Sequence, residues 1–171
     1  MDLTRFERLM LSNQFKILEG LYPEEKEYYE LHRKALDEGY KLHYEDAFES
    51  LSSDELTEEE CREVLDIFNM YRALTFSYEK LDDKSGITQE SIKFKGFDGN
   101  DEEEGKRLSY TRYFIMDLDR FEELKYNIER PSFNSHSLML QSYRRMLSAW
   151  DSINRKHVLE RDEIIRIVDE R

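Results

Sequence analysis

The residues of this chain that could do chemistry are densest in one short stretch, residues 96–101 (Gly-Phe-Asp-Gly-Asn-Asp). Asp98, Asn100 and Glu102 occupy alternate positions, as oxygen ligands do at the start of a calcium-binding EF-hand loop. An EF-hand then requires glycine at its sixth position and glutamate at its twelfth, where this chain has glutamate and serine. The calcium motif is therefore incomplete.

Two other interpretations of the same stretch remain. Gly96 and Gly99 have the spacing of a GXXG loop, which clamps a nucleic-acid backbone, but Asp98 between them would repel phosphate. Alternatively, the stretch is a turn whose Asx side chain caps the helix that follows. We favour the turn and cap.

Familiar catalytic and metal-binding patterns are missing elsewhere. Histidines 32, 43, 136 and 157 lack the spacing of helical di-iron or zinc-protease sites. The G-x-S-x-G elbow, the P-loop and the dinucleotide fingerprint do not occur. Cys61 is the single cysteine and falls on the apolar stripe of a helical pattern, which indicates an inert core thiol. We therefore predict no catalytic motif, no metal and no cofactor, and favour a non-enzymatic role over an enzymatic one.

An enzyme or ligand-binding protein would need a polar site assembled from distant residues. Such residues should lie near loops or on helix faces of mixed character, and a histidine among them could act as an acid or base. The candidates for this alternative site are Asn13, Gln14, Asp98, Asn100, His136 and Arg144.

The net charge of −13 comes from two stretches, residues 45–63 and 98–104, which carry −8 and −5. Much of this excess falls where helices should begin, and acids there complement the helix dipole. Nucleic acid is disfavoured as a partner, because phosphate binding needs a basic surface; regulatory binding through residues 144–157 is the weaker alternative. No apolar run is long enough to span a bilayer, and the first residues do not form a signal peptide, so we expect a cytoplasmic protein without a membrane partner.

Apolar residues recur every three or four positions through most of the chain, which is typical of amphipathic helices. Thr4 with Glu7 and Thr57 with Glu60 fit the capping box that begins a helix, and Gly20 and Gly39 are placed to end helices in left-handed caps. Helices are expected over residues 4–19, 23–38, part of 40–52, 57–81, 101–124, 137–153 and about 159–168.

These elements predict an all-α fold, a compact single-domain bundle of six to seven helices with at most one short extended segment near residues 90–96. We expect one domain over residues 1–171, with a possible subdomain break at residues 83–100. Each half would be small for a separate core.

Tyrosine and phenylalanine are abundant, and aromatic residues make up 13% of the chain. Tyrosines on several faces of the expected helices cannot all enter one core, and tyrosine is enriched at protein interfaces. The alternative is that these side chains cover the core edges of a monomer. We favour protein contacts, most simply a homo-oligomer, with an unidentified second protein as another partner. The interface candidates are Tyr28, Tyr29, Tyr40, Tyr44, Tyr110, Tyr113 and Tyr126.

Several segments carry a resemblance to a known family: residues 8–16 (Arg-Leu-Met-Leu-Ser-Asn-Gln-Phe-Lys), 38–40, 60–62, 66–67, 70–74, 94–98 (Phe-Lys-Gly-Phe-Asp), 143–147 (Tyr-Arg-Arg-Met-Leu) and Trp150. Together they resemble the YfbU-like family of bacterial proteins. The resemblance implies a predominantly helical, cytoplasmic, bacterial protein. It implies no activity, and no catalytic or binding residue can be transferred from the family.

Overall fold

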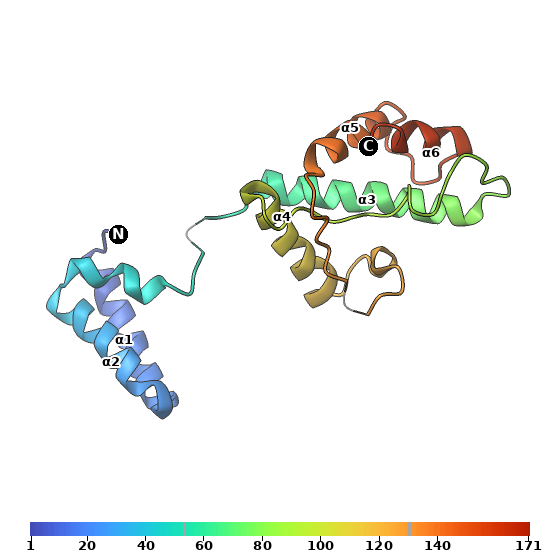
Figure 1. The fold of residues 1–171 in the computed structure, drawn as a ribbon. Helices are drawn as coiled ribbons and strands as arrows, with labels where there is room; N and C mark the ends of the chain where they lie inside the picture. The colour runs from blue at the N-terminus through green and yellow to red at the C-terminus, as the bar shows by residue number, and fades with distance from the viewer. Residues whose placement is uncertain (53, 130) are drawn as a thin grey trace. The chain divides into compact units, whose positions relative to one another are not determined.

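The computed structural model describes residues 1–52, 54–129 and 131–171. The chain divides into two compact units, Met1–Glu55 and Leu56–Arg171, which are described separately (Figure 1). Within the described ranges the structure is α-helical, with one isolated bridge between Phe97 and Asn134 in place of any β-sheet. The all-α prediction is confirmed. That residues 1–171 form a single domain stays a prediction.

The first unit is a helical hairpin of α1 (Arg5–Leu21) and α2 (Lys26–Glu38), joined by the 3₁₀ turn η1 (Pro23–Glu25). Two further 3₁₀ turns, η2 (Lys41–His43) and η3 (Glu45–Phe48), replace the short helix expected after it. The capping box at the start of α1 is confirmed, because Thr4 and Glu7 satisfy each other's backbone amides. Gly39 ends α2 in the left-handed conformation, as predicted.

The prediction that Gly20 ends the first helix is wrong. α1 continues through Gly20 to Leu21, and its last turn closes when Tyr22 donates its backbone N–H to the carbonyl of Leu18 at 2.9 Å. Nothing lies within 4 Å of the position that a Cβ atom on Gly20 would occupy. Among the described residues of the first unit, no contact therefore requires glycine at this position.

The second unit is built around the long helix α3 (Glu58–Lys80), which begins with the predicted capping box at Thr57. α4 (Glu102–Arg112), α5 (Leu140–Asp151) and α6 (Arg161–Val168) pack against it. Among the described residues, 24 buried apolar side chains from these helices and from the connecting segments form one continuous cluster. Residues 83–100 belong to this unit, since Ile87, Ile92, Phe94 and Phe97 are part of the cluster.

Two predicted helices have different bounds from those expected. The helix that begins after residue 101 ends at Arg112. A π-helical turn, η4 (Tyr113–Asp117), follows it, and the 3₁₀ turn η5 (Glu122–Lys125) comes next. Phe121 therefore lies outside the helix, in the left-handed conformation with φ 54°. The helix predicted from Ser137 begins at Leu140, because its first amides are held by a carboxylate from another helix.

Candidate functional site

The loop at residues 96–101 is a turn that caps α4, as favoured from the sequence. Asp101 accepts a hydrogen bond from the backbone N–H of Glu104 at 2.9 Å, and Asp98 accepts one from the backbone N–H of Asn100 at 3.0 Å. The carboxylates of the loop thus serve local turn and cap geometry.

Sequence reasoning missed Glu104, which is buried and holds two distant segments together. Its carboxylate accepts hydrogen bonds from the backbone N–H groups of Asp98 at 2.8 Å, Met139 at 2.7 Å and Leu140 at 2.6 Å. Such bonds to a carboxylate are strong because the acceptor is charged. Glu104 therefore caps α5 from α4. Only its place in a run of acids was visible in the sequence.

Asn134 brings together three of the six polar residues proposed as a site. Its side-chain oxygen accepts hydrogen bonds from the backbone N–H groups of Gly99 at 3.1 Å and His136 at 3.0 Å. Asp98, Asn100 and His136 consequently lie on two adjoining loops. The amide of Asn100 donates to Asp98, and His136 is exposed.

Arg144, a fourth member of that proposed site, links helices through a cluster of charges. It donates to both carboxylate oxygens of Glu63 at 2.6 and 3.1 Å, and lies 3.4 Å from Glu103. The buried Arg107 contacts Glu63 at 3.1 Å and Glu60 at 3.2 Å. Two arginines and three glutamates thus connect α3, α4 and α5, an arrangement suited to packing rather than to proton transfer.

This cluster gives the second unit a predicted acid sensitivity. Burial acts to raise the pKa of Glu63, but hydrogen bonds and charge from Arg144 and Arg107 outweigh it and hold the pKa below its usual 4.5. A lowered carboxyl pKa contributes stability that is present above pH 4.5 and is lost as the pH falls through the folded value. We expect the free energy of unfolding, measured with urea from pH 7 to pH 3, to decrease below pH 4.5. The Glu63→Gln variant should be less stable than wild type at pH 7, and its free energy of unfolding should decrease less below pH 4.5. Equal decreases in the two proteins would contradict the assignment of this acid sensitivity to Glu63.

Two hollows of the second unit have basic lining. One of about 590 Å³ is lined by Lys93, Lys95 and Lys125, and also by Glu90, Phe94 and Phe133. Each of the three lysines also lies near a carboxylate, as close as 2.8 Å for Lys125 and Asp119. Their charge is therefore already partly neutralised.

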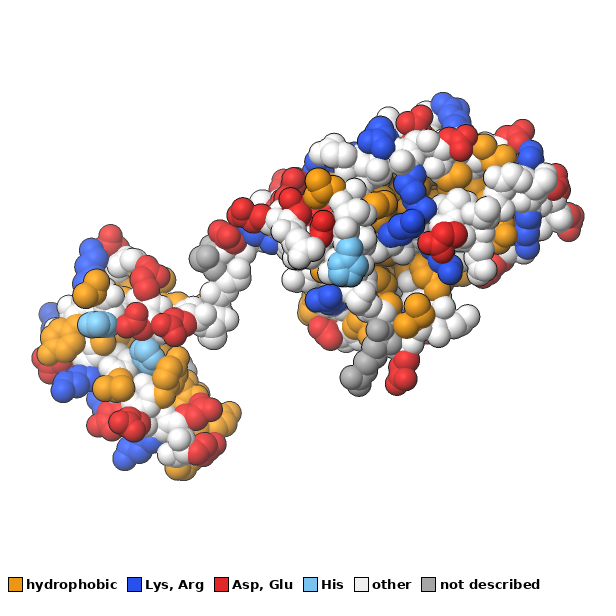
Figure 2. Space-filling model, viewed as in Figure 1, with side chains coloured by type: hydrophobic (Ala, Val, Ile, Leu, Met, Phe, Trp, Pro, Cys, Tyr) orange, Lys and Arg blue, Asp and Glu red, His pale blue; other side chains and the backbone are white. Residues whose placement is uncertain are grey.

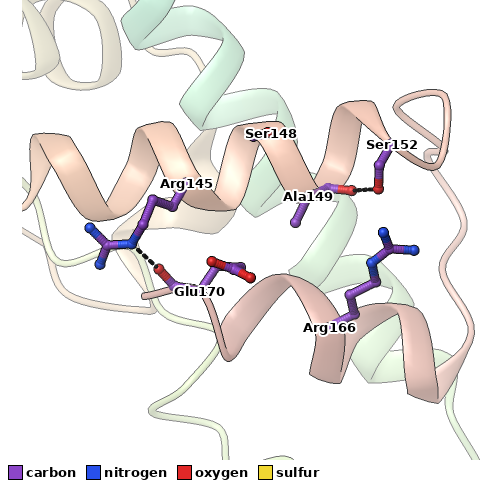
Figure 3. Close-up of a pocket in the computed structure, with 6 residues that line it drawn as sticks. All are labelled: Arg145, Ser148, Ala149, Ser152, Arg166 and Glu170. Carbon is purple, nitrogen blue, oxygen red and sulfur yellow. Dashed lines mark hydrogen bonds between the residues drawn. The ribbon is translucent and has the colours of Figure 1, made fainter.

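The second basic hollow, of about 290 Å³, lies between α5 and α6 (Figure 3). Arg145 extends from α5 and donates to the backbone carbonyl of Glu170 at 3.0 Å, while Arg166 points from α6 toward α5. Two guanidinium groups beside Ser148 and Ser152 suit a small anion, but the carboxylate of Glu170 lines the same space and opposes one.

The first unit has an exposed apolar surface along α1. We call this surface the α1 apolar face, and its five side chains are between 47% and 70% exposed. Hydrophobic side chains are visible on the surface of this unit in Figure 2. Asn13 lies within this surface and Gln14 lies beside it on α1; both are exposed, and they are the two remaining members of the proposed polar site. The α1 apolar face consists of Phe6, Leu9, Met10, Ile17 and Leu21.

The opposite side of α1 packs on α2, and several of the contacts between these two helices are polar. Ser12 donates to Asp37 at 2.5 Å, Arg33 donates to Glu19 at 2.5 Å, and Phe15 stacks on His32. Among the described residues of this unit only Ser12, Ala35, Leu36 and Tyr44 are buried. A free-standing domain buries most of its large apolar side chains, whereas this unit buries few of them and leaves the α1 apolar face exposed.

The tyrosines proposed as interface residues occupy varied environments. Tyr28, Tyr40 and Tyr113 are exposed, Tyr44 is buried, and Tyr29, Tyr110 and Tyr126 are half-buried. Two of the exposed ones line a hollow of about 440 Å³ on the first unit. It is mostly apolar, with His32 and His43 among its lining residues.

The fold and surfaces define a class of protein: a predominantly helical chain with an open helical hairpin and a second helical unit that has its own core. The chain belongs to the YfbU family, whose domain matches residues 1–170. It is similar to the UPF0304 protein MJECS11 of the archaeon Methanocaldococcus jannaschii, with 38% identity over 171 residues, covering 98% of this chain and 99% of that protein. Because that relative is archaeal, family membership does not establish the bacterial origin implied by the resemblance.

In the parts of the chain that the structure describes, no helix combines the length and apolar character needed to cross a bilayer.

Proposed function

We propose that this protein acts through protein–protein contacts as a homo-oligomer, with the hairpin of its first unit as the association surface. The observation that carries this proposal is the exposure of five large apolar side chains on the outer side of α1. A helix that is apolar on its outer face as well as near its neighbour is typical of a buried helix. A unit of this size also needs oligomerisation or another reinforcement when its own core is small.

A charge placed on the α1 apolar face tests this proposal. We expect Ile17→Glu to weaken self-association by about 100-fold, because the carboxylate would have to be buried in an apolar contact. The measurement is sedimentation equilibrium over a range of protein concentrations, with circular dichroism to check that helix content is kept.

Gln14→Glu is the matched control, since it adds the same charge on the same helix at an exposed position outside the face. It should leave the association constant within about threefold of wild type. The proposal fails if the wild-type protein does not associate, or if the two variants weaken association equally.

A small-ligand site around Asp98, Asn100, His136 and Arg144 is the second candidate function. The adjoining loops and the nearby hollow of about 590 Å³, which Asn134 lines, favour it. Against it, Arg144 and Asp98 already have partners within the second unit. A reproducible extra mass of a few hundred daltons in native mass spectrometry, lost on denaturation, would support this candidate.

A further inference from the structure

The outer side of α1 has a regular pattern centred on Asn13. Phe6, Asn13 and Gly20 are spaced by seven residues, which is close to two full helical turns, so they lie along one line. Leu9, Met10 and Ile17 flank this line. At about 100° per residue, Arg8 and Phe15, which contact α2, lie about 140° and 160° around the helix from Asn13.

No contact among the described residues of the first unit explains Gly20. Glycine is among the poorest helix formers, yet Gly20 lies inside α1 with ordinary helical geometry and open space where a Cβ atom would be. By contrast, Gly39 and Gly96 have positive φ angles. Space left open on the outside of a helix allows a large side chain from another molecule to approach the backbone.

The pattern is self-complementary when two copies of α1 run antiparallel. Phe6 and Gly20 are each seven residues from Asn13, so a two-fold axis at Asn13 places Phe6 of one copy over Gly20 of the other. The same axis places Leu9 against Ile17, and Asn13 against its own equivalent. Parallel pairing would instead oppose two phenylalanines at one end and two glycines at the other.

We propose that α1 pairs antiparallel with α1 of a second copy of this chain, with the two-fold axis at Asn13 and Phe6 filling the space above Gly20. This inference rests on the proposed function, self-association through the hairpin, and specifies its geometry. An asparagine at the centre of an apolar helix contact fixes register, because a shifted pairing would leave its amide without a partner.

The size of the contact is compatible with a specific dimer. About half of the surface of five large apolar side chains gives on the order of 500 Å² per copy, and flanking polar side chains would bring this toward the roughly 800 Å² per partner of a standard interface. The contact is therefore at the smaller end of specific interfaces, and we expect micromolar rather than nanomolar affinity.

Cysteine cross-linking of the full chain distinguishes the two orientations. In a Cys61→Ser background, mixed Phe6→Cys and Gly20→Cys chains should form a disulfide-linked dimer when oxidised with copper phenanthroline, because antiparallel pairing brings the two positions within disulfide range. Each of these variants alone should give at least about tenfold less cross-linked dimer. Asn13→Cys should cross-link with itself.

Leu9→Cys mixed with Ile17→Cys provides an independent pair in case the changes at Phe6 and Gly20 weaken the contact they report on. Gln14→Cys, on the same helix beside the line, is the control and should cross-link poorly. If dimers form but Phe6→Cys cross-links mainly with itself, the antiparallel register is overturned while self-association stands. If the wild-type chain is monomeric at all concentrations, the proposed function itself is overturned.

Discussion

Replacing Gly96 by alanine should destabilise the second unit by more than about 4 kcal/mol, the range reserved for disruptive core changes. A Cβ atom at this position would lie 1.7 Å from the backbone oxygen of Phe133, and the φ angle of +86° also disfavours alanine. Because the backbones at Gly96 and Phe133 lie so close, the N–H of Phe97 donates to the carbonyl of Phe133 and the N–H of Ser135 donates to the carbonyl of Phe97, both at 3.0 Å. With alanine at position 96, the segments around Gly96 and Phe133 must move apart, and these two backbone hydrogen bonds are then lost or lengthened.

Urea denaturation followed by fluorescence measures this effect directly. Trp150 is the single tryptophan and is buried in the second unit, so its emission reports on that unit. Gly105→Ala is the matched control, because its Cβ atom would meet only one backbone oxygen at 3.8 Å, and alanine is the better helix former by about 1 kcal/mol. The two alanine substitutions should therefore have opposite signs. Similar stabilities would contradict the close approach at Gly96.

Replacing Glu104 by glutamine should cost about 2–3 kcal/mol of stability, although the two side chains have nearly the same shape. The carboxylate accepts three backbone hydrogen bonds, two of them from the start of α5. An amide nitrogen in place of one oxygen would face backbone N–H donors, and leave at least one buried donor without an acceptor.

Glu102→Gln is the control for this effect, since Glu102 is an exposed acid of the same helical turn. It should change the free energy of unfolding by no more than about 0.5 kcal/mol. A loss at position 104 no larger than at position 102 would mean that the carboxylate is not essential for capping α5. The same urea titration serves for both variants.

Features that depend on neighbouring residues were predictable from the sequence. Thr4 and Thr57 each begin a helix with a glutamate three residues later, because the capping box is a contact within one turn. Gly39 ends α2 for an equally local reason, its positive φ angle. The long periodic pattern of α3 is also local, and its bounds agree closely with those expected.

Features that depend on distant residues could not be predicted. Glu104 reads as one acid among several, and only the fold shows that it caps α5. Gly96 was singled out as part of a loop, but the backbone of Phe133 that it accommodates is 37 positions away. Glycine is common at helix ends, so the sequence predicts that Gly20 ends α1; in the described part of the first unit no contact distinguishes that role from a place inside the helix.

The polar site proposed from the sequence is only partly assembled. Asp98, Asn100 and His136 are brought to adjoining loops by Asn134, which sequence patterns did not identify. Arg144 instead joins a cluster of charges between helices. Residue types near loops were visible in the sequence, whereas their partners were not.

The mass of the intact wild-type protein in solution tests the central claim most directly. Native mass spectrometry, supported by sedimentation equilibrium over the micromolar range, should give a species of twice 20.8 kDa, or a higher even multiple, that increases with concentration. A protein that stays at 20.8 kDa throughout this range would contradict self-association through the hairpin.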